Sequence, residues 1–173
     1  MYSVNERLLL TLHKCAHRNH ILDATILFIA RFFIFFLVAG FFIIMGVAQP
    51  EALPFATLEF VVAFVVSLLF SVLIGYWYHM ERPCERSDVK ALFKPFHHGK
   101  TFPSDHTTVI FVCAGLLALW GMPIFSLVMI VCGLLVGAAR VIAGVHYPVD
   151  IFGGALWGWF VGVLVGMLGQ WFT

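Results

Sequence analysis

Five long apolar stretches dominate the chain and leave few folds open to it. Residues 21–47, 55–78, 105–120, 124–142 and 148–171 are rich in Phe, Leu, Val, Ile and Gly and contain few charged side chains. A helix needs about 20 apolar residues to cross a bilayer, and most of these stretches approach or exceed that length. Because a membrane span must satisfy its own backbone hydrogen bonds, the sequence predicts an all-α, polytopic membrane helical bundle with about five transmembrane helices.

The composition supports a membrane protein and argues against other classes. Of 173 residues, 62% are hydrophobic and 11% are charged, and the mean hydropathy is +1.00, which is outside the range of soluble domains. No polar linker divides residues 1–173, so we expect a single domain in the bilayer. A net charge of +1 without a dense basic run argues against nucleic acid as a partner. The sequence carries no signal for an oligomeric state.

The first part of the chain predicts an interfacial segment and a long span. Residues 2–20 alternate apolar and basic side chains, which is typical of an amphipathic helix at a membrane surface. Residues 21–47 exceed the length of one span, so we expect a tilted helix. Arg31 within it should face the bundle interior, because an arginine is costly in lipid. If the first two spans are antiparallel, Arg31 and Glu59 come within reach of each other.

The long polar segment, residues 79–104, holds half of the Lys and Arg residues. Its prolines and glycine predict an ordered loop with short helical pieces. We interpret His97 and His98 as loop residues rather than metal ligands, because adjacent histidines point in different directions. The spans 105–120 and 124–142 form a hairpin, so this polar segment and residues 140–150 emerge on the same membrane face.

Three polar residues follow one another between the last two spans. Pro148 suits the first turn of a helix, which makes Tyr147 or His146 the cap and places Asp150 in that turn. His146 and Asp150 are then four residues apart, so the carboxylate can orient the imidazole and leave its other nitrogen to attack. Arg140 offers a planar fork for phosphate oxygens. The alternative is a capping aspartate beside a histidine that faces lipid headgroups.

The residues that converge on this face fit an anionic phosphoryl group. Arg82 and Arg140 supply guanidinium groups, and Ser104 is expected to bind phosphate, a role that is compatible with capping the helix. His146 would attack phosphorus to give a phosphohistidine, and His106 would protonate the leaving oxygen and then activate water. Asp105 complements the helix dipole and is a candidate to tune His106. This scheme requires no metal ion or other cofactor.

These residues resemble the signature of the phosphatidic acid phosphatase type 2 and vanadium haloperoxidase superfamily. The matching residues are Arg82-Pro83, Pro103-Ser104-Asp105-His106, Arg140, His146 and Asp150. The chain departs from the signature at Gly75, Asp105 and Ala139, where the family has lysine, glycine and serine. The missing lysine removes one phosphate contact of the signature, and our hypothesis is that Arg86 or a loop lysine replaces it.

Residues 102–108 and 144–150 resemble the bacitracin-resistance type of undecaprenyl diphosphate phosphatase. This resemblance implies removal of the terminal phosphate from undecaprenyl diphosphate. Two alternatives stay open. The same chemistry could act on phosphatidylglycerol phosphate, phosphatidic acid or a lipid A phosphate. A non-hydrolytic lipid-phosphate transporter or binding protein would keep the arginines but would not need the pair His146 and Asp150, so the intact pair argues against it.

Two arguments about sidedness disagree. Most Lys and Arg residues lie on the predicted active-site face, and the positive-inside rule would place that face in the cytoplasm. The family resemblance implies a bacterial inner (plasma) membrane protein whose active site faces the periplasm or the cell exterior. We expect the outer face, because several of these charges are needed to bind phosphate and do not report topology.

Overall fold

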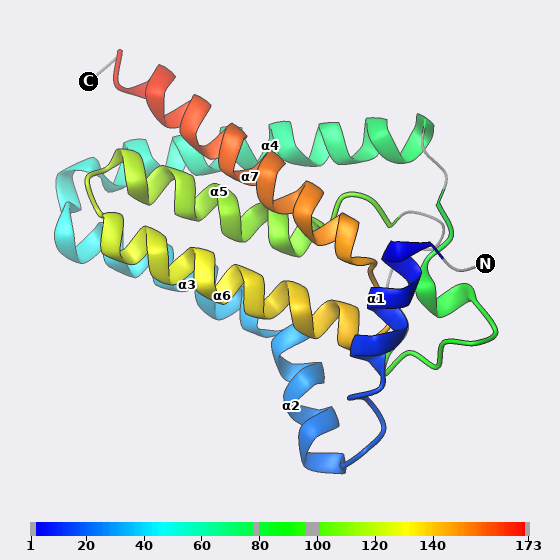
Figure 1. Cartoon of the computed structure of the whole chain (residues 1–173). Coiled ribbons are helices and arrows are strands. Elements are labelled where there is room, and N and C mark those ends of the chain that lie inside the picture. The colour runs from blue at the N-terminus through cyan, green and yellow to red at the C-terminus, as the bar shows by residue number, and fades with distance from the viewer. Residues whose placement is uncertain (1–2, 78–79, 96–100, 172–173) are drawn as a thin grey trace.

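The computed structural model describes residues 3–77, 80–95 and 101–171. Seven α-helices and two 3-10 turns occur in these ranges, and no strand does. The helices are α1 (Val4–His13), α2 (His20–Arg31), α3 (Phe33–Ala48), α4 (Leu53–Trp77), α5 (Asp105–Leu119), α6 (Pro123–Ile142) and α7 (Pro148–Gly169). The short turns are η1 (Pro50–Ala52) and η2 (Pro83–Glu85). The predicted all-α fold is confirmed (Figure 1).

Helix α5 is the centre of the bundle. It contacts α3, α4, α6 and α7, and every residue from 107 to 117 is buried. A helix that is apolar on all sides is stable only where other helices surround it. The apolar character of α5 therefore reflects its place inside the bundle.

Glycines on one face of α7 allow it to pack closely on α5. A Cβ atom built on Gly158 would lie 2.2 Å from the carbonyl oxygen of Thr108, and one on Gly162 would lie 2.6 Å from that of Val112. Together with Gly154, these glycines recur every four residues, as in small-xxx-small helix contacts. The first turns of α5 and α7 are consequently held side by side.

Fewer helices than predicted have the length of a membrane span. In the described ranges, α6, α7 and the helix formed by η1 with α4 are long and apolar enough, and α2 with α3 makes a fourth candidate that is bent by 48°. Helix α5 has 15 residues, fewer than the roughly 20 that cross a bilayer. The predicted third span is thus a shorter helix enclosed by the others.

The predicted first span is not one tilted helix, because it breaks at Phe32 between α2 and α3. Two carbonyl groups beside the break accept hydrogen bonds from distant residues. Arg140 Nη1 donates to the Ala30 carbonyl at 2.7 Å, and the His106 ring donates to the carbonyl of Arg31. Side chains that insert into the hydrogen-bond ladder of a helix cause such kinks.

The predicted pairing of Arg31 with Glu59 is wrong. Glu59 accepts a hydrogen bond of 2.7 Å from Trp120 Nε1, near the turn between α5 and α6. Arg31 lies beside His106, at the other end of α5. All of α3 lies between Arg31 and the turn that leads into α4, whereas Glu59 lies in the first turns of α4, so the two side chains are far apart along the bundle.

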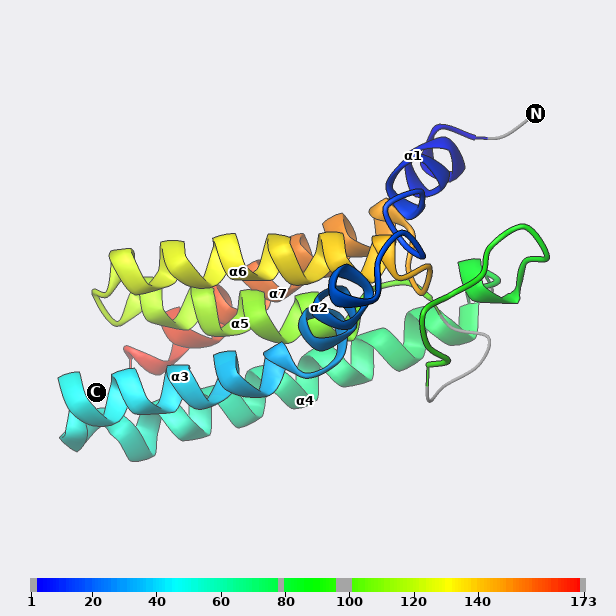
Figure 2. The ribbon, with the colours of Figure 1, turned by 90° about the horizontal axis from the view of Figure 1, so that it is seen from below.

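Helix α1 covers the start of α7 and is shorter than the predicted amphipathic segment. Ser3 and Glu6 form a capping box at its first turn. Its side chains reach the end of α6 and the start of α7: His13 Nδ1 donates to the Ile142 carbonyl at 2.7 Å, and Asn5 Oδ1 accepts from the Val149 N–H at 3.1 Å. Figure 2 shows α1 and residues 80–95 at the end of the bundle opposite the turns that join α3 to α4 and α5 to α6.

Candidate active site

The loop between α6 and α7 presents a histidine to the centre of the protein. Helix α7 begins at Pro148, with Tyr147 as its N-cap and Asp150 in its first turn, as the sequence predicted. His146 precedes this cap and is 3% exposed. The proline therefore places the histidine and the aspartate on one turn, where they can meet.

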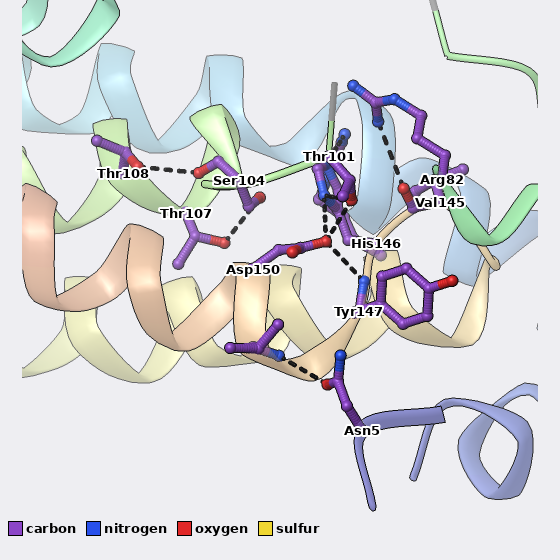
Figure 3. A network of polar contacts seen from close by, with 12 residues as sticks. Asn5, Arg82, Thr101, Ser104, Thr107, Thr108, Val145, His146, Tyr147 and Asp150 are labelled. Atoms are coloured by element: carbon purple, nitrogen blue, oxygen red, sulfur yellow. Dashed lines mark hydrogen bonds and ion pairs between the residues drawn. The ribbon is translucent and has the colours of Figure 1, made fainter. Parts of the chain in front are cut away.

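The Asp150 carboxylate is the centre of a buried hydrogen-bond network (Figure 3). Its Oδ2 atom accepts from the Tyr147 N–H at 2.8 Å and from the Thr101 hydroxyl, and it lies 3.2 Å from His146 Nδ1. A carboxylate accepts hydrogen bonds, so Nδ1 is the protonated nitrogen of the ring. This arrangement leaves the lone pair on Nε2 of His146.

Two buried arginines surround that histidine. Arg140 Nη2 lies 3.1 Å from His146 Nε2, and Arg82 Nη1 donates to the Val145 carbonyl at 3.3 Å. The Nε groups of Arg82 and Arg140 have no hydrogen-bond partner among the described residues, although both are buried. An unsatisfied buried donor is costly, and the oxygens of a bound anion would satisfy both groups.

These residues line a cavity of about 520 Å³. Among its described lining residues, four are basic and one is acidic, and the others are the two histidines and apolar side chains. The basic residues are Arg31, Arg82, Lys94 and Arg140, the acidic one is Asp105, and the histidines are His106 and His146. Phe32, Phe35 and Phe93 line the same cavity. The cavity therefore combines an excess of positive charge with apolar walls, which suits a phosphate attached to a lipid.

The electrostatics of the loop favour a neutral His146. Burial, assisted by the Arg140 guanidinium, lowers the pKa of His146 to about 4, although Asp150 acts in the opposite direction. Burial also lowers the pKa of Arg82 from its usual range, but an arginine remains protonated near neutral pH. At pH 7 the site thus holds an unprotonated imidazole nitrogen beside guanidinium groups, which is the state a nucleophile needs.

Ser104 and Asp105 lie at the start of α5 but face different surroundings. Ser104 is fully buried, and its hydroxyl accepts from the Thr107 hydroxyl at 3.2 Å. It makes no side-chain cap hydrogen bond with the described residues and lies outside the cavity lining. Asp105 does line the cavity, and the Ser71 hydroxyl donates to it at 2.5 Å. Asp105 is therefore tied to α4 as well as placed at the site.

Arg86, predicted to replace the family lysine, lies outside the cavity lining. It binds both oxygens of Asp88 at 2.9 Å and also pairs with Glu6, and these bonds raise its pKa. A loop lysine, the other predicted substitute, does reach the cavity in the form of Lys94. His97 and His98 lie outside the described residues.

The sequence does not predict the place of two residues in the site. Thr101 is 1% exposed and bonds Asp150, yet its only signal in the sequence is its position shortly before the motif at residues 103–106. The sequence predicts that Arg31 faces the interior, which indicates a function, but the partner it predicts, Glu59, bonds Trp120 instead. The kink beside it, at Phe32, has no local sequence signal.

Comparison with known proteins gives the same family as the motifs. The chain matches the PAP2 superfamily over residues 56–172. It is 25% identical to undecaprenyl-diphosphatase BcrC of Bacillus subtilis (strain 168) over 173 aligned residues, which cover 95% of this chain and 82% of that protein. It is 32% identical to YbjG of Escherichia coli (strain K12) over 103 residues, covering 58% of this chain and 50% of YbjG. The chain thus matches half the length of that relative.

The fold also resembles a solved structure. The crystal structure of Aquifex aeolicus LpxE superposes with a TM-score of 0.73 at 22% identity and covers 98% of this chain and 96% of that one. At this identity the likeness shows the fold alone. Since the family match covers more than half of the residues and includes Arg82, His106 and His146, the chain belongs to the PAP2 superfamily.

Proposed function

We propose that this protein hydrolyses a membrane lipid diphosphate, undecaprenyl diphosphate, to undecaprenyl phosphate and phosphate. The observation that carries the proposal is the orientation of His146, whose Nδ1 faces Asp150 and whose Nε2 faces Arg140 in a cationic cavity. The choice of substrate is supported by the name of BcrC, the relative that aligns with 95% of this chain.

The first half of the proposed reaction forms a phosphohistidine. Arg82 and Arg140 donate to the oxygens of the terminal phosphate, and His146 Nε2 attacks its phosphorus atom. A nitrogen–phosphorus bond forms as the bond from phosphorus to the bridging oxygen breaks. His106 donates a proton to that oxygen, and the lipid leaves as a monophosphate. Asp150 stabilises the positive charge that develops on the His146 ring.

The second half regenerates the histidine. His106, now neutral, takes a proton from water as the water oxygen attacks phosphorus. The nitrogen–phosphorus bond breaks, inorganic phosphate leaves, and His146 returns to its neutral form with Nδ1 still bonded to Asp150. No step in this scheme uses a metal ion.

Phosphate release from purified protein in detergent with EDTA tests this function. We expect undecaprenyl diphosphate to release phosphate faster than phosphatidylglycerol phosphate or phosphatidic acid do. His146→Ala should abolish release, while the control His20→Ala, at an exposed position, should leave it unchanged. Release from a glycerolipid alone would overturn the substrate, and release that is indifferent to His146 would refute the mechanism.

We also propose that the cavity opens on the outer face of the bacterial plasma membrane. The proposal is supported by the four basic residues that line the cavity, Arg31, Arg82, Lys94 and Arg140. Their place there is explained by anion binding, so they do not report the orientation of the protein in the membrane. Lys94 and Glu51 are exposed near opposite ends of the bundle, which makes them a matched pair for cysteine substitution after the natural cysteines are replaced. An impermeant thiol reagent on intact cells should label Lys94→Cys and spare Glu51→Cys; the reverse pattern would invert the orientation.

A further inference from the structure

Arg31 stands at the junction between the polar and apolar parts of the cavity. It ends α2 and lines the cavity with Arg82, Arg140 and the two histidines. Its guanidinium carbon lies 5.5 Å from the ring centre of Phe32 and 5.9 Å from that of Phe93. Both rings are also part of the cavity wall, and such contacts hold a cation in position. Arg31 is thus a fixed positive charge beside the surface that a lipid chain would contact.

The backbone couples Arg31 to the proposed general acid. The ring of His106 donates a hydrogen bond to the carbonyl of Arg31. The neighbouring carbonyl, that of Ala30, accepts from Arg140 at 2.7 Å. The residues of the kink are therefore positioned by the same side chains that would bind and protonate the substrate.

The geometry of in-line displacement predicts which part of the substrate lies beside Arg31. The attacking nitrogen and the leaving oxygen lie on opposite sides of the phosphorus atom, so the leaving group extends from His146 past His106. In a lipid diphosphate, the next group is a second phosphate that carries negative charge. In a lipid monophosphate, the same position holds an uncharged methylene group.

We infer that Arg31 binds the phosphate that stays on the lipid and thereby makes the site selective for diphosphates over monophosphates. This inference rests on the proposed function and assigns one substrate group to one residue. Arg31 neutralises the charge that builds on the departing phosphate, whereas Arg82 and Arg140 hold the phosphate that is transferred. A role limited to shaping the kink would affect both kinds of substrate equally.

The test compares farnesyl diphosphate with farnesyl phosphate, which share a lipid tail and differ by one phosphate. We expect Arg31→Gln to lower kcat/KM for the diphosphate by about 10- to 100-fold, as for loss of a hydrogen bond to a charged group. The same variant should lower kcat/KM for the monophosphate by less than about threefold. Arg31→Lys keeps the charge and should preserve most of the selectivity. The control Arg18→Gln, at an exposed position, should leave both substrates unaffected.

The outcomes separate this inference from the function on which it rests. If the wild-type protein cleaves no diphosphate, both are refuted. If it cleaves the diphosphate and Arg31→Gln leaves the ratio of the two kcat/KM values unchanged, the inference alone is refuted. Thermal unfolding in detergent reports whether Arg31→Gln is folded. An equal loss of kcat/KM on both substrates in a folded variant would refute a selective role.

Discussion

Replacing Thr101 with valine isolates one hydrogen bond of the network around Asp150. The Thr101 hydroxyl donates to Asp150 Oδ2 and lies 3.4 Å from His146 Nδ1. Valine has nearly the same shape as threonine, so Thr101→Val removes the donor without opening a cavity. The carboxylate keeps its bonds to the Tyr147 N–H and to His146, but one fewer group fixes its orientation.

The magnitude follows from the type of bond that is lost. A hydrogen bond to a charged group contributes about 1.5–3 kcal/mol, and about 1.4 kcal/mol in the activation barrier changes a rate tenfold. If the bond positions Asp150 for the attack by His146, Thr101→Val should lower kcat by about 10- to 100-fold. KM should change little, because Thr101 lies outside the cavity lining.

A second threonine provides the control. Thr108 is also buried, and its hydroxyl donates to the backbone carbonyl of Ser104 at 3.0 Å, so it does not touch Asp150. Thr108→Val should lower the free energy of unfolding by about 1 kcal/mol and leave kcat nearly unchanged. Phosphate-release kinetics and thermal unfolding in detergent measure both effects. The reasoning would be refuted if Thr101→Val had the same kcat as the wild-type protein, or if Thr108→Val lowered kcat as much as Thr101→Val does.

Two further predictions concern pH and helix packing. Because the pKa of His146 is lowered to about 4, the acid limb of the pH profile of kcat/KM should lie well below the ordinary histidine value of about 6.5; a limb near 6.5 would contradict a buried neutral nucleophile. The unfolded chain binds more protons than the folded one between these two pKa values, so this group's contribution to stability rises with pH across that window and falls as the medium is acidified. Gly158→Ala places a methyl group 2.2 Å from the Thr108 carbonyl oxygen and should lower stability by about 1–3 kcal/mol. Gly40→Ala, whose Cβ meets only the end of the Met129 side chain at 3.9 Å, should raise Tm or leave it unchanged; equal Tm values for the two variants would show that α5 and α7 are not held by this contact.

Local patterns were sufficient for the helices and for part of the site. The apolar stretches predicted α4, α5, α6 and α7 close to their observed bounds, because each helix is a continuous apolar segment with Gly, Pro or a polar residue within two positions of its ends. Pro148 marked the start of α7, and the spacing of four residues placed His146 beside Asp150. These features depend on neighbours within one turn of the chain.

The kink at Phe32 had no such local signal. No proline or glycine lies at that position, and the carbonyl groups beside it bond Arg140 and His106, which are far away in the sequence. The sequence suggested that Arg31 meets Glu59, but the whole of α3 separates Arg31 from the turn before α4, near which Glu59 lies. In the structure, Arg31 lines the cavity with Arg82 and Arg140 instead.

The sequence by itself therefore determined the all-α membrane architecture and the pairing of His146 with Asp150, because helical periodicity and proline geometry act over a few residues. Only the tertiary structure decided which other groups reach that pair. Thr101 enters the network while Ser104 turns to Thr107, and Arg31 lines the cavity while Arg86 binds Glu6 and Asp88. The positions of these side chains depend on the close contact between α7 and α5, which the glycines of α7 allow, and on the bend between α2 and α3. The contact and the bend both involve segments that are distant in the chain.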